Sequence, residues 1–346
     1  MKKPQMLQKG DKIAVVSLSS GMMGDALFIH KYEIAKSRLE NVFGLKVVPI
    51  PHALKGSEFI YENPKARAKD LMDAFQDDSI KGIFCAIGGE DSIRILPYID
   101  YDVIRDNPKV FIGYSDSTIS HLIMNKAGLI SFYGVTVVVE FGEYVKMFDY
   151  TREQVEKILF ADCKGYEIKP SKYWSKDFVS WDPENVDIGK ELLIDEKGYE
   201  VLQGSGVIRG SLLGGCVDVF SMCVGTEIWP SPKEWKDKIL LLETSEEKMP
   251  PKDLKYALRG LAAQGVLGKV RAIVVGKPQE EVYYEEYKEV YKKVLKEYCL
   301  EELPIIYNVN IGHAYPTGIL PLGSDIEIDF DSKKILLVES PCEQIS

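Results

Sequence analysis

Short apolar runs alternate with helical patterns along the first half of the chain. The β-rich runs are residues 12–18, 45–50, 82–87 and 110–113. Apolar positions with helical spacing cover residues 30–42 and 63–75, and another helix is expected to start at 92–96. This β-α-β-α order predicts a parallel sheet covered by helices, and such sheets bind ligands at the carboxyl ends of their strands.

Three strand ends in this half carry small or reactive residues, and we expect them to meet at one edge of the sheet. Their sequences are SLSSG at 17–21, GGED at 88–91 and GYSD at 113–116. In the last of them an apolar run stops at Gly113, and Ser115 precedes a stretch with helical spacing. A serine at such a strand–turn–helix elbow projects its hydroxyl above the sheet, where a nearby base can turn it into a nucleophile.

The match of this elbow to the hydrolase pattern G-x-S-x-G is incomplete, because Ser117 stands in place of the second glycine. Two interpretations of Ser115 are therefore open. In one, Ser115 is a nucleophile. In the other, Ser115 and Asp116 cap the helix that follows, a position that both residue types favour.

Residues 166–205 differ from the flanking sequence, because they are aromatic, polar and aperiodic. We expect a long loop or linker here, between a nucleophile-bearing α/β domain at residues 1–165 and a second α/β domain at residues 206–346. In the second domain, strands are expected at 206–210, 238–242, 272–276, 305–309 and 325–330. Helical patterns cover residues 214–223, 254–264 and 285–297.

Composition narrows the class of protein. The 346 residues suffice for about two domains. The 43 Lys and Arg against 53 Asp and Glu give a net charge of −10, which disfavours nucleic acid and anionic membranes as partners. We expect neither a secretory signal nor a membrane span, since no apolar stretch approaches ~18 residues. The six cysteines show no C-x-x-C spacing, so we expect reduced thiols, no metal, no cofactor and a cytoplasmic protein.

His313 is the histidine best placed to act as a base for Ser115. It follows the apolar run at 305–309, and it lies between Gly312 and Ala314 in a loop with nearby prolines. A solvent-exposed turn histidine is the alternative. The remaining histidines are expected to be surface or packing residues: His30, His52 and His121.

Glu243 is the candidate orienting acid, because it places a carboxylate at the end of the buried strand expected at 238–242. A charge there is costly unless it is paired or hydrogen-bonded, and a histidine N–H would satisfy it. The alternative is that Glu243 faces water together with Glu246 and Glu247.

An oxyanion hole needs backbone donors that face the developing negative charge. We nominate the amide of Asp116, directly after the serine, and the amide of Gly89 at the neighbouring strand end. The double glycine at 88–89 permits close approach of backbone to substrate, although it could equally serve the turn alone.

Several motifs of the chain occur in the order typical of one family. They are the Gly88–Gly89 turn, IGYSD at 112–116, FYG at 132–134, IRGSLLGG at 208–215, LLLE at 240–243, GH at 312–313 and LPLG at 320–323. Together they resemble the LD-carboxypeptidase family of serine peptidases over nearly the whole chain. The resemblance implies a Ser–Glu–His triad at Ser115, Glu243 and His313. It also implies an N-terminal domain like that of class I glutamine amidotransferases, a C-terminal domain particular to the family, and a homodimer.

Two branches of this family are relevant to the substrate. One removes the terminal D-alanine from murein tetrapeptides, and the other resembles the microcin C self-immunity protein, which cleaves an amide between an acidic amino acid and a nucleotide analogue. The aromatic segment at 174–181 favours the second branch, in which a loop tryptophan stacks on the nucleobase. Trp181 is our candidate for this contact, and its alternative role is to pack the loop onto the body. The family usually has Asn where this chain has Cys216, which leaves the local packing or a substrate contact open.

The expected function is therefore a serine carboxypeptidase-type amide hydrolase that acts on an acidic aminoacyl-nucleotide, with murein tetrapeptides as the alternative substrate. A noncatalytic protein that binds a small ligand is a different class, and its function would not depend on Ser115. A dinucleotide-binding oxidoreductase is disfavoured. The second strand ends in PIPH at 49–52, with no acid for a ribose hydroxyl.

Overall fold

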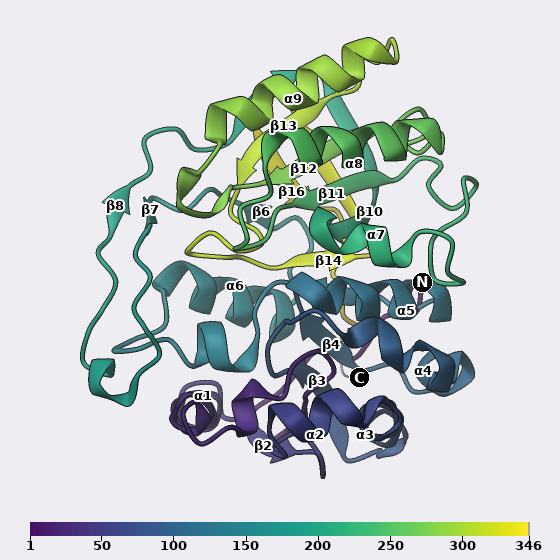
Figure 1. Cartoon of the computed structure of the whole chain (residues 1–346). Helices are drawn as coiled ribbons and strands as arrows, with labels where there is room; N and C mark the ends of the chain where they lie inside the picture. The colour runs from purple at the N-terminus through teal and green to yellow at the C-terminus, as the bar shows by residue number, and fades with distance from the viewer. Residues whose placement is uncertain (345–346) are drawn as a thin grey trace.

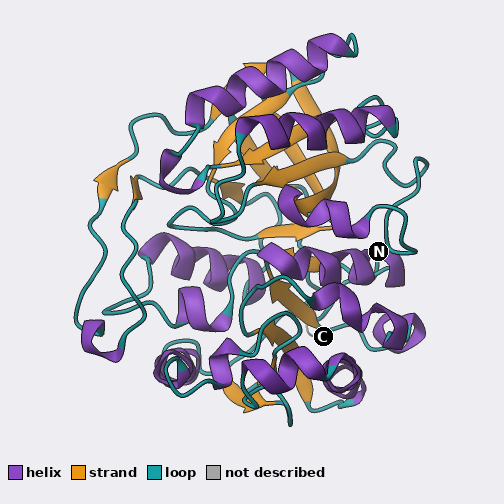
Figure 2. Ribbon diagram, in the orientation of Figure 1, coloured by secondary structure: helices purple, strands orange, loops and turns teal. Residues whose placement is uncertain are grey.

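Two large sheets, each flanked by helices, form the body of the computed structural model, which describes residues 1–344 (Figures 1 and 2). The N-terminal sheet has six strands in the order β14-β5-β4-β3-β1-β2. Its strands are β1 (Lys12–Val16), β2 (Lys46–Pro49), β3 (Ile80–Cys85), β4 (Val110–Gly113), β5 (Ser131–Tyr133) and β14 (Leu320–Leu322). Strands β1 to β5 run parallel, as the alternating pattern predicts, and β14 is antiparallel to β5.

Alternating side chains of these strands build a core on each face of the sheet. Ile13 and Val15 of β1 belong to one core, together with residues of α1 (Ile29–Asn41) and α6 (Asp149–Leu159). Ala14 and Val16 of the same strand belong to the other core, together with residues of α3 (Pro64–Gln76), α4 (Tyr101–Asp106) and α5 (Thr118–Ala127). A strand that is apolar on both faces needs helices on both sides. The short helix α2 (Ser57–Glu62) also belongs to this half.

The C-terminal sheet is mixed and curves into a half-barrel (Figure 2). Its eight strands lie in the order β6-β16-β15-β10-β11-β12-β13-β9. They are β6 (Glu167–Ile168), β9 (Glu200–Gln203), β10 (Val207–Cys216), β11 (Ile239–Glu243), β12 (Ala272–Gly276), β13 (Ile305–Val309), β15 (Asp325–Asp329) and β16 (Lys334–Leu337). Strands β10 to β13 are parallel, and the outer pairs are antiparallel. Helices α8 (Pro251–Ala263) and α9 (Tyr284–Glu297) pack against Leu240 and Leu242 of β11.

Strand β14 carries a segment of the C-terminal half into the N-terminal sheet. Leu320 pairs with Tyr133, and Leu322 pairs with Ser131. Figure 1 shows β14 between the two layers of the molecule. The chain just before β14 contains His313, whose ring lies edge-on to that of Tyr114 with 5.0 Å between centroids. The fold thus brings a loop of the second half against the end of β4.

The helix expected at 214–223 is wrong for its first part. Strand β10 continues to Cys216 and pairs in parallel with β11, so that Gly214 lies opposite Leu241. Gly214 and Gly215 have φ angles of 143° and 149°, which no α-helix contains. The only α-helical turn of this segment is α7 (Phe220–Cys223), after a 3₁₀ turn.

Residues 166–205 are not loop throughout. β6 and β9 join the C-terminal sheet, and β7 (Tyr173–Trp174) pairs with β8 (Leu193–Ile194). The chain between β7 and β8 runs past α6 toward α1 (Figure 1), and it carries Trp181. Residues 345–346 of the expected second domain lie outside the described residues. Among residues 1–344, no helix is long and apolar enough to cross a bilayer.

Candidate active site

Ser115 occupies a strained turn between β4 and α5. Its φ is +63°, in the left-handed region that residues other than glycine rarely adopt. Ser115–Ser117 form a single 3₁₀ turn, after which α5 starts at Thr118. Strain at a strand–helix elbow is typical of a serine whose hydroxyl is held clear of the sheet.

The alternative role of Ser115 as a helix cap does not fit the structure. The N-cap of α5 is Ser117, and no side chain makes a capping hydrogen bond there. Asp116 is fully buried, and its carboxylate accepts a hydrogen bond from the Ser92 amide at 2.9 Å. Ser115 therefore takes no part in capping α5.

The Gly88–Gly89 turn lies directly against the elbow. A methyl group at Gly88 would lie 2.8 Å from Ser115 Cβ, 2.9 Å from Ser115 Oγ and 3.7 Å from the Asp116 amide nitrogen. Only glycine permits this approach of the backbone to the hydroxyl. Residues from all three of the expected strand ends line one hollow beside Ser115. The sheet edge predicted from the sequence is therefore present.

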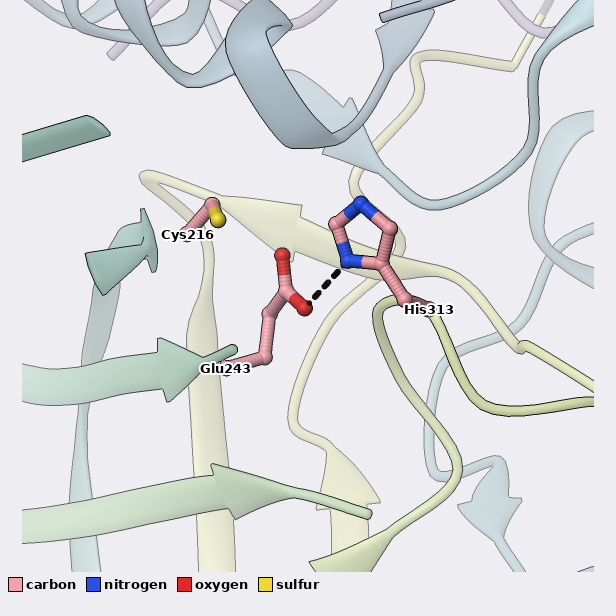
Figure 3. Close-up of side chains that lie close together, drawn as sticks. All are labelled: Cys216, Glu243 and His313. Atoms are coloured by element: carbon pink, nitrogen blue, oxygen red, sulfur yellow. Dashed lines mark hydrogen bonds and ion pairs between the residues drawn. The ribbon is translucent and has the colours of Figure 1, made fainter. Parts of the chain in front are cut away.

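Glu243 and His313 form a buried pair (Figure 3). Glu243 ends β11 and is 1% exposed, and His313 lies after β13 and is 7% exposed. His313 donates from Nδ1 to Glu243 Oε2 at 2.7 Å, and Tyr133 donates its hydroxyl to Glu243 Oε1 at 2.5 Å. Both carboxylate oxygens are paired, so Glu243 does not face water, and His313 is not an exposed turn residue.

The second ring nitrogen of His313 faces another carboxylate. Nε2 lies 2.9 Å from Glu246 Oε2, an ion-pair distance without the alignment of a hydrogen bond. Burial by itself lowers the pKa of His313, but Glu243 and Glu246 on the two sides of the ring raise this pKa to about 10. No hydrogen bond joins Ser115 to His313 in the described chain. The two carboxylates therefore favour the imidazolium form of His313, and Glu246 lies at the nitrogen that a reacting serine needs.

Tyr133 connects the elbow to this pair, and it is not among the site residues expected from the sequence. Its hydroxyl accepts a hydrogen bond from the Ser115 amide at 3.2 Å and donates to Glu243. The phenol thus links the backbone of the candidate nucleophile to the candidate acid across the two halves of the chain. The sequence did contain a pointer to it, since Tyr133 is the centre of the FYG motif at 132–134.

Two hollows meet at Ser115. The aromatic hollow encloses about 630 Å³, and its lining includes Phe28, Tyr114, Phe178, Trp181, His313 and Tyr315. The acidic hollow encloses about 500 Å³, and its acidic side chains are Glu90, Asp91, Asp218, Glu246 and Glu247. Ser115 and Glu246 line both hollows. A substrate bound at Ser115 can therefore extend in two directions with different chemistry.

The two tryptophans of the 166–205 segment have different surroundings. Trp181 lines the aromatic hollow and packs edge-on against Phe28, with 6.1 Å between ring centroids. The centroid of its ring lies 4.8 Å from Lys31 Nζ. The ring centroid of Trp174 lies instead 4.4 Å from Lys277 Nζ. Trp181 both packs the loop onto the body and borders the hollow, so its two expected roles are compatible.

Cys216 lies beside the Glu243–His313 pair, where three potential metal ligands gather (Figure 3). The donor atoms of Cys216, Glu243 and His313 lie within 4.8 Å of one another. Burial, with Glu243 and Asp218 nearby, raises the pKa of the Cys216 thiol well above its usual value, whereas metal binding needs the thiolate. His313 Nδ1 is also already bonded to Glu243. The arrangement favours a hydrogen-bonded pair over a metal centre.

The three other histidines make structural contacts. His30 and His52 are partly exposed and are hydrogen-bonded to a tyrosine and an aspartate. His121 is buried beneath the elbow, where Nε2 donates to the Gly113 carbonyl at 2.9 Å and Nδ1 accepts from Ser131 Oγ at 2.8 Å. Burial lowers the pKa of His121 to about 4, so its ring is neutral and supports the elbow from below.

Comparison with known proteins places the chain in a family. Residues 13–134 match the N-terminal domain of LD-carboxypeptidases, and residues 209–328 match the C-terminal domain. The microcin C7 self-immunity protein MccF of Escherichia coli is 32% identical over 278 residues, which cover 80% of this chain and 78% of that protein. The chain belongs to the LD-carboxypeptidase family of serine peptidases.

Solved structures of other LD-carboxypeptidase family members have the same fold. An MccF-like protein from Streptococcus pneumoniae, in complex with AMP, superposes with a TM-score of 0.87 at 35% identity, over 94% of this chain and 98% of that one. MccF in complex with aspartyl sulfamoyl adenosine superposes with a TM-score of 0.86 at 28% identity, over 99% and 100% of the two chains. Within the LD-carboxypeptidase matches, Ser115 falls in the N-terminal domain, and Glu243 and His313 fall in the C-terminal domain.

Proposed function

We propose that this LD-carboxypeptidase family member hydrolyses an amide between an amino acid and a nucleotide, with Ser115, Glu243 and His313 as its triad. One observation carries the proposal. The strained Ser115 opens into the aromatic hollow that also holds His313, and His313 is paired to the buried Glu243. A serine, a histidine and an orienting carboxylate in this arrangement suit acyl transfer.

The mechanism follows from the roles of the three side chains. Neutral His313 accepts the Ser115 proton at Nε2, after Glu246 has left that nitrogen, and the hydroxyl oxygen attacks the amide carbonyl. The imidazolium then protonates the leaving amine, and the acyl-enzyme forms. His313 next takes a proton from water as the water oxygen attacks the acyl-enzyme. It returns this proton to Ser115 Oγ when the bond between Oγ and the acyl carbon breaks, which releases the amino acid and restores Ser115. Throughout the cycle Glu243 holds the proton on Nδ1 and stabilises the imidazolium.

Two backbone amides are the proposed oxyanion donors. Gly89 belongs to the turn that lies against Ser115 Oγ, and Asp116 directly follows the serine. Donors held in place by a turn and by the start of a helix stabilise a tetrahedral oxyanion without reorganising during the reaction.

The aromatic hollow supports a nucleotide as the leaving group. Trp181, Phe28 and Phe178 offer flat or apolar surface, on which a base can stack. Relatives with this fold were solved with AMP and with aspartyl sulfamoyl adenosine. The acyl group of the MccF ligand is acidic, whereas the carboxylates of the acidic hollow in this chain disfavour an acidic acyl group.

The test compares substrates in one assay. The purified protein is incubated with aminoacyl sulfamoyl adenosines and with a murein tetrapeptide, and cleavage is followed by mass spectrometry. We expect cleavage of a nucleotide amide, and a loss of at least about a thousandfold in kcat for Ser115→Ala. Ser37→Ala, at an exposed position of α1, is the matched control. Full activity of Ser115→Ala would refute the triad, and cleavage of the tetrapeptide alone would replace the nucleotide by murein.

A further inference from the structure

The lining of the acidic hollow contains carboxylates and neither lysine nor arginine. Five acidic side chains take part: Glu90, Asp91, Asp218, Glu246 and Glu247. Asp91 is neutralised by Arg67 at 2.9 Å and by Arg94 at 3.1 Å. Glu246 faces His313, and the remaining three have no lysine or arginine partner within residues 1–344. Asp91 offsets only one of the two arginines, but the three carboxylates without a cationic partner still leave the hollow with a net negative charge beside Ser115.

Other residues of this hollow suit an aliphatic stem and a hydrogen-bonding head. Ile60, Tyr61, Val219 and Met222 contribute an apolar wall. Ser19 is 4% exposed and also lines the hollow, and its hydroxyl has no hydrogen-bond partner in the described chain. A long side chain that ends in an ammonium group buries its stem on apolar surface and keeps its charge among oxygen ligands.

The lysine nearest in sequence does not compensate the charge. Lys248 follows Glu247, but its Nζ binds Glu280 at 2.8 Å, and Glu280 lines the aromatic hollow. An aspartyl or glutamyl side chain in the acidic hollow would therefore meet carboxylates with no free cation in the lining. Like charges confined in one site repel and exclude such a ligand.

The proposed reaction decides which part of the substrate occupies the acidic hollow. His313 has to protonate the leaving amine, and it lines the aromatic hollow rather than the acidic one. The leaving nucleotide therefore extends into the aromatic hollow. The acyl group, which stays on Ser115 in the acyl-enzyme, extends into the acidic hollow.

We infer that the acyl group is a basic amino acid of the lysyl or ornithyl class, with its side-chain ammonium among Glu90, Asp218 and Glu247. The inference rests on the proposed function for the placement of the acyl group. It also names the specificity-determining residues, because the ammonium is recognised by carboxylates that an acidic or apolar acyl group would leave unused.

The first experiment measures binding, so that it does not depend on turnover. Ser115→Ala protein is titrated calorimetrically with lysyl, norleucyl and aspartyl sulfamoyl adenosine. Norleucine has the same stem as lysine but lacks the ammonium. We expect the lysyl compound to bind about tenfold more tightly than the norleucyl compound, and the aspartyl compound to bind most weakly.

The second experiment removes the charges that carry the inference. Glu90 and Glu247 are both exposed, and Glu90→Gln and Glu247→Gln should each lower the lysyl-to-norleucyl affinity ratio about threefold. Glu302→Gln is the control: Glu302 is exposed and outside the hollow, so this variant should leave the ratio unchanged. Tighter binding of the aspartyl compound than of the lysyl one would overturn the inference. An unchanged affinity ratio in the variant that combines Glu90→Gln with Glu247→Gln would also overturn it. A lysyl preference without hydrolysis by the unaltered protein would instead count against the amide hydrolase.

Discussion

Removing the Glu246 carboxylate should make the free protein a better catalyst at neutral pH. Glu246 lies 2.9 Å from His313 Nε2, and together with Glu243 it raises the pKa of His313 to about 10. In the proposed mechanism only neutral His313 can accept the Ser115 proton. We therefore expect kcat/KM to rise with pH as His313 loses its proton, and Glu246→Gln to move this rise to lower pH.

The size of the shift follows from the distance and the exposure of the carboxylate. The Glu246 side chain is 58% exposed, so its interaction with the ring is screened by water. Two unit charges 2.9 Å apart attract each other by about 1.4 kcal/mol at the dielectric constant of water, which corresponds to about one pH unit. At a fixed pH below the rise, kcat/KM should therefore increase about tenfold.

The assay follows kcat/KM from about pH 6 to about pH 11 with norleucyl sulfamoyl adenosine, so that the range extends past the His313 pKa of about 10. An uncharged acyl side chain separates the titration of His313 from charge effects in the acidic hollow. Glu247→Gln is the matched control, because it removes a neighbouring carboxylate that makes no contact with His313, and it should leave the midpoint of the rise in place. A midpoint that stays unchanged or moves upward in Glu246→Gln would show that this carboxylate does not hold the proton on His313.

Three further predictions concern the pair, the loop and the core. Gly312 has a φ of +91°, and a methyl group there would overlap the Glu243 carboxylate. Gly312→Ala should therefore lower kcat at least about a hundredfold. An unchanged kcat would contradict the role of the Glu243–His313 pair. Trp181→Ala should raise KM for a nucleotide amide about tenfold with little change in kcat, whereas Trp181→Phe should keep most of the stacking. If Trp181→Ala and the unaltered protein have the same KM, Trp181 does not stack on the substrate. Burial raises the pKa of Glu140 to about 7 from 4.5, so this carboxyl favours the folded state below pH 4.5 and loses that contribution as pH rises through 7. The unfolding free energy of Glu140→Gln minus that of the unaltered protein should therefore rise by about 2 to 3 kcal/mol from pH 5 to pH 8, as measured by urea denaturation. A difference that does not change with pH would disprove the raised pKa of Glu140.

Much of the framework was predictable from the sequence, because long apolar strands and amphipathic helices have local patterns. β1, β3, β4, β11, β12 and β13 all lie within a few residues of the expected runs. The very short strands β5, β14 and β16 were not expected, because three or four residues carry too little periodicity. Residues 214–216 were expected to be helical, but pairing with β11 overrides that local pattern.

The candidate site was likewise predictable from the sequence only in part. The elbow at Ser115, the strand-end position of Glu243 and the loop position of His313 could be recognised from their immediate neighbours in the sequence. Tyr133 was not recognised, because its importance depends on contacts with the Ser115 amide and with Glu243, which is 110 residues away. Glu246 was considered only as a solvent-exposed companion of Glu243, and its contact with His313 could not be seen in the sequence.

By itself the sequence determined the order of the elements, the chemistry of the strand ends and the membership of a peptidase family, because each depends on short segments whose pattern survives without the fold. Only the tertiary structure decided which charges meet. β14 brings the His313 loop across to the elbow, and residues from both halves of the chain build an acidic hollow and an aromatic hollow at Ser115. Electrostatic interactions act through space over a few ångströms, so the protonation of His313 and the charge that the site selects depend on distances that linear order does not contain.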